Sequence, residues 1–302
     1  MDTSLGTNVN GPSLIRVPDW IERPLGKYYL YFAHHQGKFI RMAYADHIRG
    51  PYTVYAPGVL SIEHTPFSRH IASPDVHVDD AARTIVMHYH GNGCTEANDL
   101  PHKQVTCYAA SADGLHFASD RAYIANAYLR TFFHDGWHYG LSGGGERQVC
   151  RSRDLRSRFQ YGPFLQIDGE EFTPLSTIQK DGPDGPTIYR VRHVCFHRRG
   201  QDLDIYYSNV GDVPERIKRT TIDLRKDWHE WRGSRFEEVL RPETDYEGVK
   251  EPLVRSLGGS KHHPVHELRD PFVFEEEGRA YLLYSVAGEQ GIGLAEMCQR
   301  AY

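Results

Sequence analysis

The sequence lacks the features that define several large classes of protein. Its five cysteines are scattered over 302 residues without a Cys-x-x-Cys pair, which argues against a disulfide framework or a cysteine zinc site. No apolar run approaches the roughly 20 residues that a membrane span needs. The 35 basic residues are outnumbered by 40 acidic ones, whereas nucleic-acid binding favours a basic face. We therefore expect neither a membrane nor a nucleic acid as a partner.

Residues 1–12 also lack the basic flank and apolar stretch of a secretory signal. On that pattern we expect a cytoplasmic protein. Nothing in the sequence indicates its oligomeric state.

The residues that are abundant favour β-structure. The chain has 28 Gly, 17 Pro, 19 Tyr and 13 Phe against only 4 Met, and aromatic and turn-forming residues are typical of strands joined by tight turns. Long amphipathic helical patterns are almost missing. The best helical window, residues 222–240, is interrupted by Trp228, Trp231 and Gly233. We predict a connection there with one helical turn.

Short strand-like runs recur along the chain between Gly, Asp and Pro residues. Most are followed by a polar turn and a further run, and an apolar stretch precedes each. This unit repeats five times at about 50 to 75 residues, which is typical of a β-propeller. We predict an all-β, five-bladed β-propeller that forms a single domain over residues 1–302. A β-sandwich or two unrelated β domains is the alternative, although the spacing is long and regular for a simple sandwich. The predicted blades are 10–60, 70–120, 122–168, 186–240 and 265–300.

Polar residues stand at the strand ends that should meet at one end of the central channel. In an antiparallel blade the start of the first strand lies beside the end of the second. Those positions are dominated by His, Arg, Asp and Glu, which carry acid–base chemistry and bind hydroxyls or carboxylates. The candidates are Asn10, His35, Asp75, His90, Arg130, Arg192, His193, Arg269, Asp270 and Glu289.

Three motifs resemble the five-bladed propeller glycosidases of glycoside hydrolase families 43, 62, 32, 68 and 117. They are residues 28–32, the Ser-Pro-Asp-Val run at 73–76, and Arg-Asp-Pro-Phe-Val-Phe at 269–274 with the strand-like run 278–285. Their order and spacing extend over essentially the whole chain. The resemblance implies hydrolysis of a glycosidic bond in a poly- or oligosaccharide. Family 43 members use a first-blade carboxylate base, a second aspartate that tunes pKa and a glutamic acid as proton donor, and they invert the anomeric centre. An oxocarbenium-like transition state needs one protonated and one ionised acid.

The sequence departs from the family 43 pattern at two positions. Asn10 stands where the first-blade aspartate is expected, and an amide is not a general base. The Glu-Gly-Pro of the acid strand is absent from the start of the fourth blade, although Glu247-Gly248 occurs in the loop before the fifth. Family 117 members use a histidine as the acid, and His193 is the analogue here.

We accordingly expect a glycoside hydrolase with Asp75 and Asp270 as its carboxylates, one activating water and the other orienting it. His193 or Glu247 is the expected proton donor, and Glu289 is a further acid candidate. No cofactor is required in this scheme. Three arginines suggest an acidic sugar, because Arg pairs bidentately with carboxylate or sulfate. The expected substrate-binding residues are Asn10, His35, His90, Arg130, Arg192 and Arg269.

Two alternatives remain open on the sequence. The first is a metal-assisted lyase or hydrolase, because imidazoles and carboxylates together suit a divalent cation in the central channel. No local ligand motif supports it. The second is a non-catalytic sugar-binding propeller, which the Asn10 departure favours. Many ionisable groups in one cleft argue against the second, since buried charges cost several kcal/mol unless they are paired. The metal ligands in the first alternative are His35, His90, His193, Asp75 and Asp270.

Overall fold

The computed structural model describes residues 7–35, 37–94, 104–142, 147–172 and 189–298. These residues form five antiparallel sheets, each running in chain order from its first strand. The first sheet is β1 (Asn10–Arg16), β2 (Tyr28–Ala33), β3 (Phe39–Ala45) and β4 (Thr53–Val54), with β5 (Leu60–Ser61) also paired to β3. The second sheet is β6 (His70–Asp79), β7 (Thr84–Asn92), β8 (Gln104–Ser111) and β9 (Ala118–Asn126).

The remaining sheets follow the same plan. A short parallel pair and three single-turn 3₁₀ helices, η2 (Ile62–His64), η5 (Trp228–Glu230) and η6 (Asp245–Glu247), lie in the connections. The third sheet is β10 (Arg130–His134), β11 (Trp137–Ser142), β12 (Gln148–Ser152) and β13 (Gln160–Phe164). The fourth is β15 (Arg190–Arg199), β16 (Asp202–Val210), β17 (Ile217–Asp223) and β19 (Glu237–Leu240), and the fifth is β20 (Arg269–Glu276), β21 (Arg279–Val286) and β22 (Gly291–Met297). The parallel pair is β14 (Gln166–Ile167) and β18 (Arg232–Gly233).

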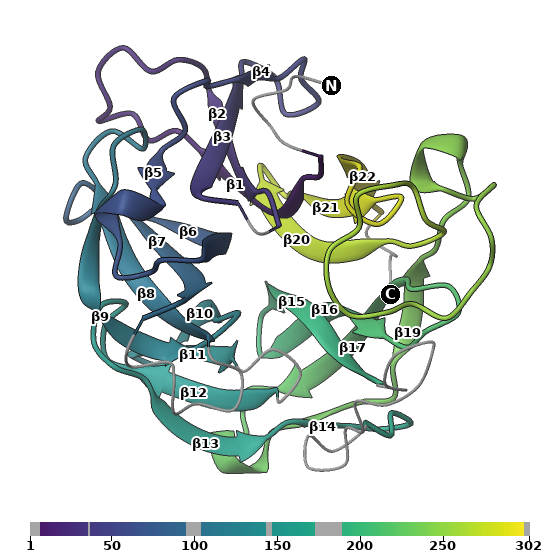
Figure 1. Cartoon of the computed structure of the whole chain (residues 1–302). Coiled ribbons are helices and arrows are strands. Elements are labelled where there is room, and N and C mark those ends of the chain that lie inside the picture. The colour runs from purple at the N-terminus through teal and green to yellow at the C-terminus, as the bar shows by residue number, and fades with distance from the viewer. Residues whose placement is uncertain (1–6, 36, 95–103, 143–146, 173–188, 299–302) are drawn as a thin grey trace.

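The five sheets are the blades of a β-propeller (Figure 1). The first strand of each blade is innermost: β1 packs against β6 and β20, and β15 packs against β10 and β20. Because neighbouring blades cover both faces of a sheet, its inner strands are buried on both sides, as in β2, whose six residues are all buried. The predicted all-β, five-bladed fold is confirmed.

Two details differ from the prediction. The expected boundary between the second and third blades, at residues 120–122, falls inside β9, which pairs with β8. Four of the blades also have a fourth strand beyond the three-strand unit that the pattern indicated. The fourth strands are outer edges with less apolar sequences, so the hydrophobic pattern marks them weakly. The predicted start of the fourth blade, residue 186, lies outside the described residues.

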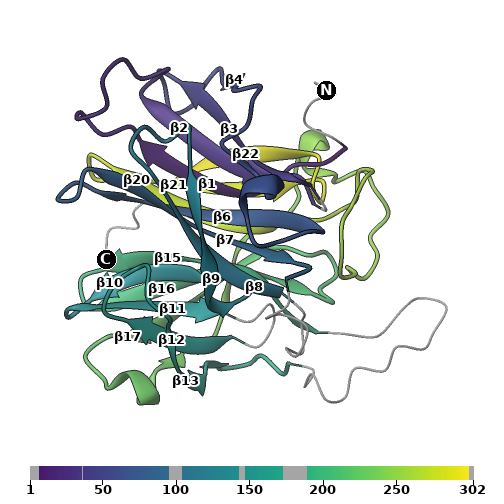
Figure 2. The same ribbon diagram turned by 60° about the vertical axis from the view of Figure 1, so that its left-hand side comes forward.

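The ring is closed where the first blade meets the last. Figures 1 and 2 both show β1 beside β20 and β21. The backbone N–H of Val9 donates to the Glu289 carbonyl at 2.8 Å. The Glu276 carboxylate accepts from the Tyr28 hydroxyl at 2.6 Å and pairs with Arg16 at 2.7 Å. Among the described residues the two sheets share no strand, so this backbone hydrogen bond, the side-chain contacts and apolar packing between the blades close the propeller.

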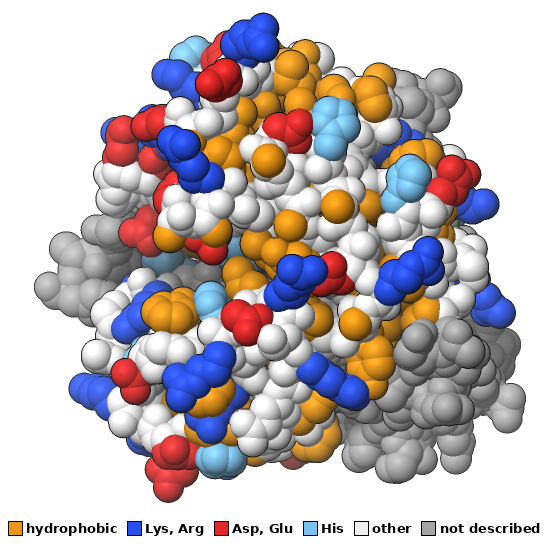
Figure 3. All heavy atoms as spheres, turned by 90° about the vertical axis from the view of Figure 1, so that its left-hand side faces the viewer, with side chains coloured by type: hydrophobic (Ala, Val, Ile, Leu, Met, Phe, Trp, Pro, Cys, Tyr) orange, Lys and Arg blue, Asp and Glu red, His pale blue; other side chains and the backbone are white. Residues whose placement is uncertain are grey.

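The surface mixes charges of both signs. On the face shown in Figure 3, basic and acidic side chains are interspersed among neutral and hydrophobic ones, in keeping with a net charge of only −5. None of the helices in the described part of the chain has the length and hydropathy to cross a membrane. Four of the five cysteines, Cys94, Cys107, Cys150 and Cys195, are buried.

Candidate active site at the mouth of the propeller

Backbone irregularities mark the start of the innermost strands. β1, β6, β15 and β20 each have a register shift near their first residues. Gly11, Ser73 and Asp270, each followed by a proline, have φ of +59°, +50° and +50°. A positive φ is unfavourable for a residue with a Cβ and is found at functional sites. β-bulges re-aim side chains, and here they turn the first residues of these strands toward the end of the channel.

The starts of β1, β6 and β20 can be aligned with one another, and this alignment shows which residue of each strand corresponds to Asn10. By register, Gly11 corresponds to Ser73 and Asp270, and Asn10 corresponds to Arg269. A Cβ on Gly11 would lie 3.1 Å from the Ser73 Cα, and its φ of +59° is unfavourable for a residue with a Cβ, so a side chain there would be strained. The Gly11 N–H donates instead to the Asp270 carboxylate, at 3.4 Å. The fifth blade therefore places the Asp270 carboxylate beside the bulge of the first blade, where the corresponding residue, Gly11, has no side chain.

A pocket opens at this end of the channel, and we call it the mouth pocket. All five blades or the loops beside them contribute to it, and seven of the eleven residues that the sequence identified as candidates line it. Its lining residues are Asn10, His35, His70, Ala72, Ser73, His90, Tyr128, Arg192, His193, Asp270 and Glu289.

His193 and Asp270 form a buried pair in the mouth pocket. His193 Nδ1 lies 2.5 Å from Asp270 Oδ1, although the two groups are not aligned as a regular hydrogen bond. The other ring nitrogen, Nε2, is 3.4 Å from the Ser73 hydroxyl. Burial alone would raise the pKa of Asp270, but His193, Arg192 and Arg269 hold it well below its usual range. Asp270 is therefore an ionised carboxylate that orients the His193 ring.

Glu289 and His35 form a second pair. The His35 Nδ1 lies 3.1 Å from Glu289 Oε1, and the same carboxylate accepts from Arg269 at 3.2 Å and from the Lys261 N–H at 3.2 Å. Burial raises the pKa of Glu289, but the hydrogen bond and charge of His35 and the charge of Arg269 outweigh it, so the pKa is lowered overall. The mouth pocket thus contains two ionised carboxylates, each against an imidazole.

An aromatic wall completes the pocket. The Tyr128 ring lies between His90 and His193, with centroids 4.1 and 4.5 Å away, and Tyr128 itself has a strained φ of +58°. Burial lowers the pKa of His90 well below its usual range, and His70 adds to the effect. The Tyr128 and His90 rings offer apolar faces and polar edge atoms, a combination that suits a ring-shaped ligand with hydroxyl groups.

His70 makes the stability of the fold depend on pH. Burial, with a contribution from His35, lowers its pKa to about 4, against about 6.5 in the unfolded chain. Between these pH values the unfolded state binds more protons at His70 than the folded state does. Titration of His70 therefore leaves the free energy of unfolding unchanged above pH 6.5 and lowers it as the pH falls toward 4. We expect His70→Gln to reduce this slope by at most about 1.4 kcal/mol per pH unit. Urea unfolding across pH 4–7 measures it; the same slope in the variant, or an equal change in the exposed control His47→Gln, contradicts the assignment.

The structure places Asp75 and Arg130 outside the mouth pocket. Asp75 lies two residues further along β6, where its Oδ2 accepts from His77 Nε2 at 2.9 Å and from the Thr131 N–H at 3.0 Å. Arg130 lies 3.3 Å from Asp75 Oδ1. Burial raises the pKa of Asp75, but His77 and Arg130 reverse the effect and hold it well below its usual range. This group joins the second and third blades below the mouth.

The two other predicted arginines are already paired with carboxylates. Arg192 lines the pocket but binds Glu215 through two nitrogens, at 2.7 and 2.9 Å. Arg269 is fully buried behind the pocket, where it pairs with Glu267 and Glu289. The charge of each guanidinium is thus balanced by a carboxylate, and Arg269 also holds the pocket carboxylate Glu289.

Glu247 also lies away from the mouth pocket. It is buried at the end of η6, where Oε2 accepts from the backbone N–H groups of Glu243 and Thr244 and from the Thr244 hydroxyl. Its Oε1 accepts from the Tyr284 hydroxyl at 2.9 Å. These are the contacts of a capping box, which gives Glu247 a structural place in the loop.

Sequence reasoning missed some residues of this region. His70 and Ser73 line the pocket, and the available signal for Ser73 was its place as the first residue of the Ser-Pro-Asp motif. For a metal, the described residues bring three ligand atoms within 4.8 Å of one another at Asp75, His77 and His88. The set of His35, His90 and His193 with two aspartates does not form such a group in the described part of the chain.

Comparison with solved structures identifies the class of fold. The chain superimposes on a GH43 β-xylosidase/α-arabinofuranosidase, CoXyl43, from a compost microbial metagenome, with a TM-score of 0.65 and 16% identity over 98% of this chain and 93% of that one. An exo-1,5-α-L-arabinanase from a bovine ruminal metagenomic library gives 0.61 and 12% over 96% and 93%. At such identities the likeness shows a shared fold, the five-bladed propeller of GH43 enzymes.

The sequence itself has a much closer relative. It is 38% identical over 309 residues to uncharacterized protein R118 of Acanthamoeba polyphaga mimivirus, which covers 96% of this chain and 83% of the viral protein. The chain belongs to the same family as that protein. No family model matches the sequence.

Proposed function

We propose that the protein is a glycoside hydrolase that cleaves a poly- or oligosaccharide in the mouth pocket by general acid–base catalysis. The observation that carries the proposal is the His193–Asp270 pair, in which an ionised carboxylate holds an imidazole with Nε2 directed at the pocket. The neighbours in fold support the reaction class, since the solved structures of similar shape include xylosidases and an arabinanase.

His193 takes the role of proton donor in this proposal. Its Nε2 protonates the departing glycosidic oxygen, and the Asp270 charge beside Nδ1 stabilises the imidazolium that supplies the proton. Asp270 therefore acts through His193. The two ionised carboxylates, Asp270 and Glu289, also favour the positive charge that develops on the sugar ring.

Glu289 is the proposed general base. It is ionised through its contacts with His35 and Arg269, and an ionised carboxylate can take a proton from the attacking water. An acid and a separate base on opposite sides of the sugar correspond to an inverting reaction. Both proton transfers run through side chains, so the chemistry requires no cofactor.

NMR of the first-formed anomer of the product tests whether the reaction inverts the anomeric centre. A retained configuration contradicts the inverting mechanism.

An acidic sugar requires a cation other than those predicted. Arg130, Arg192 and Arg269 are all paired with carboxylates. Arg190, at the start of β15, interacts electrostatically with Tyr128 and Arg192, and no carboxylate is among the groups that shift its pKa. We propose Arg190 as the residue that selects a uronic acid or sulfated sugar. A uronide preference that persists in Arg190→Gln would overturn this role.

A substrate screen tests the proposed activity. We expect the purified protein to release sugar from aryl glycosides or oligosaccharides, with pentosides such as xylosides and arabinofuranosides tested first and glucuronides and galacturonides beside them. Reducing-end assays and chromatography of the products measure the release. Binding of a sugar, seen as a thermal shift, without release from any substrate would favour a non-catalytic sugar-binding propeller instead.

A further inference from the structure

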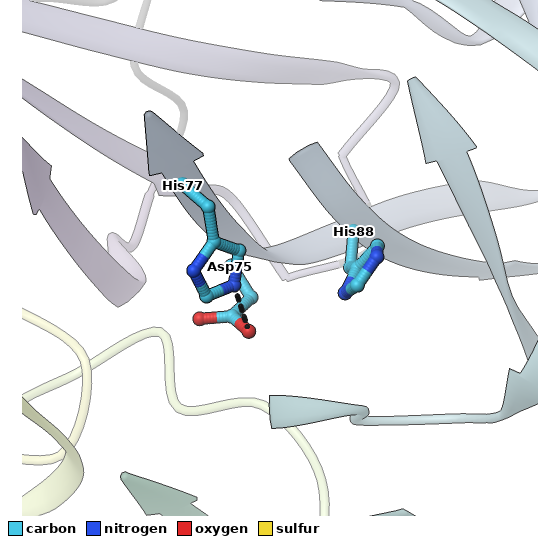
Figure 4. Close-up of side chains that lie close together, drawn as sticks. All are labelled: Asp75, His77 and His88. Carbon is cyan, nitrogen blue, oxygen red and sulfur yellow. Dashed lines mark hydrogen bonds and ion pairs between the residues drawn. The ribbon is translucent and has the colours of Figure 1, made fainter. Parts of the chain in front are cut away.

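A second cluster of ligand-type side chains lies below the mouth pocket, between the second and third blades. It consists of Asp75 and His77 on β6 and His88 on β7. Asp75 is the direct cross-strand partner of His88, and His77, two residues along, projects from the same face of the strand. Figure 4 shows the His77 ring against the Asp75 carboxylate, with His88 on the neighbouring strand. One ligand atom from each residue lies within 4.8 Å of the others.

The hydrogen bonding of His88 is typical of a metal-binding histidine, with one ring nitrogen bonded to a carbonyl and the other left unpaired. Its side chain is fully buried, and Nε2 lies 2.7 Å from the Leu155 carbonyl. A carbonyl only accepts, so Nε2 carries the proton and Nδ1 presents a lone pair. That Nδ1 is buried and has no hydrogen-bond partner. Metal-binding histidines usually donate their other N–H to a carbonyl or carboxylate in this way, whereas an unpaired buried nitrogen is otherwise costly.

The other two ligands are oriented by the third blade. His77 Nε2 is 3.0 Å from the Thr131 hydroxyl as well as 2.9 Å from Asp75 Oδ2. Arg130 pairs with one oxygen of the Asp75 carboxylate, Oδ1. The other oxygen, Oδ2, faces the imidazoles of His77 and His88. An ion bound there would replace the His77–Asp75 hydrogen bond with two coordinate bonds.

A groove gives access to the cluster. A cavity of about 770 Å³ lies between the second and third blades, and of the three ligand residues it is His77 that lines it, together with Thr131. Three acidic residues of the same groove, Asp79, Asp80 and Asp154, offset the charge that an ion would add next to Arg130. Arg153 and Arg156 also line it, with Arg156 paired to Asp120.

We infer that Asp75, His77 and His88 form a binding site for a divalent transition-metal ion, best suited to Zn²⁺, with its open coordination position toward the groove. Two imidazoles and one carboxylate are a ligand set for zinc and its neighbours, whereas Ca²⁺ and Mg²⁺ prefer oxygen ligands. Because His88 is anchored to Leu155 and Asp75 to Arg130, the ion would tie the second blade to the third. The site is separate from the hydrolytic pocket, and neither proposal depends on the other.

Metal binding to the full chain tests the site directly. After treatment with a chelator, the protein should take up one equivalent of Zn²⁺ in calorimetry, and its melting temperature should rise with added Zn²⁺. Co²⁺ should give visible d–d bands of a low-coordinate site. We expect His77→Gln and His88→Gln each to weaken binding roughly tenfold or more, while His138→Gln, a histidine of the same groove outside the cluster, leaves binding unchanged.

Several outcomes overturn the inference. They are the absence of stoichiometric uptake, uptake that survives both substitutions, or equal loss in His138→Gln. Should His88→Gln fail to fold, His77→Gln decides the matter, because the His77 side chain is 29% exposed and tolerates the change more readily. Retention of Zn²⁺ binding by a folded His77→Gln protein contradicts the site.

Discussion

Replacing His193 by alanine should abolish hydrolysis of substrates with poor leaving groups and spare much of the activity on good ones. General acid catalysis contributes about 10²–10⁴-fold to rate, and a departing alkoxide needs that proton whereas a dinitrophenolate does not. We expect kcat on an unactivated oligosaccharide to fall by about 10²–10⁴-fold. The loss on a dinitrophenyl glycoside should be far smaller. Steady-state rates on a series of aryl glycosides, plotted against leaving-group pKa, measure the difference.

The matched control is His47→Ala, which removes an exposed histidine from the first blade. It should leave both rates unchanged. A uniform loss across all leaving groups in His193→Ala would indicate that the ring orients the substrate, and the proton donor would then have to be sought among the other groups of the mouth pocket.

Replacing Lys218 by methionine should strongly destabilise the fold. Its ammonium is fully buried and lies 3.0 Å from Glu170, 2.9 Å from Asp212 and 2.8 Å from the Tyr189 hydroxyl. Removing one partner of a buried ion pair leaves uncompensated charge and costs about 3–5 kcal/mol. Methionine keeps the volume of the side chain, so the loss is electrostatic. Urea unfolding monitored by circular dichroism measures the change in free energy of unfolding.

The pH dependence separates this cause from a packing defect. Burial already raises the pKa of Asp212, against the effect of Lys218. Without Lys218 that pKa rises further, so protonation favours the folded state and the destabilisation shrinks as the pH falls from 7 to 5. The exposed control, Lys226→Met, should change stability by less than about 0.5 kcal/mol. A deficit that is the same at both pH values would contradict the electrostatic account.

The fold could be predicted because its signal is local and repeated. The sequence of each blade contains the same succession of tight turn and apolar strand. Examples are Lys27–Ala33 after Gly26 and Ala280–Ser285 after Gly278. Fourth strands such as β9, with an exposed and polar sequence, carry little of that signal. The second blade therefore ends at Asn126, six residues beyond its predicted boundary.

The site was harder to predict because a shift of two residues along a strand moves a side chain from the mouth into the channel. Ser73 lines the mouth pocket and Asp75, two residues on, does not. The bulges that decide which residue faces the pocket depend on positive φ values at Ser73 and Asp270, which non-glycine residues rarely adopt. The motif therefore identified a strand that reaches the pocket, and its carboxylate, Asp75, lies outside the pocket lining.

Ion pairing was the other feature that the sequence could not reveal. Glu215 follows Arg192 by 23 positions, yet the two form a bidentate pair, and Arg269 lies among three carboxylates. Such pairs depend on how loops return to the channel rather than on local spacing. Counting arginines near strand ends therefore includes guanidinium groups that are already paired with carboxylates.

Turnover and binding of one oligosaccharide, measured side by side in the wild type and in Asp270→Asn, test the central claim most directly. The amide preserves the shape of the side chain but removes the charge that holds and stabilises the His193 ring. We predict hydrolysis by the wild type, and binding of comparable affinity without hydrolysis by the variant, as measured by calorimetry and product analysis. Equal hydrolysis by both proteins, or binding without hydrolysis by the wild type, would contradict a catalytic mouth pocket built on Asp270 and His193.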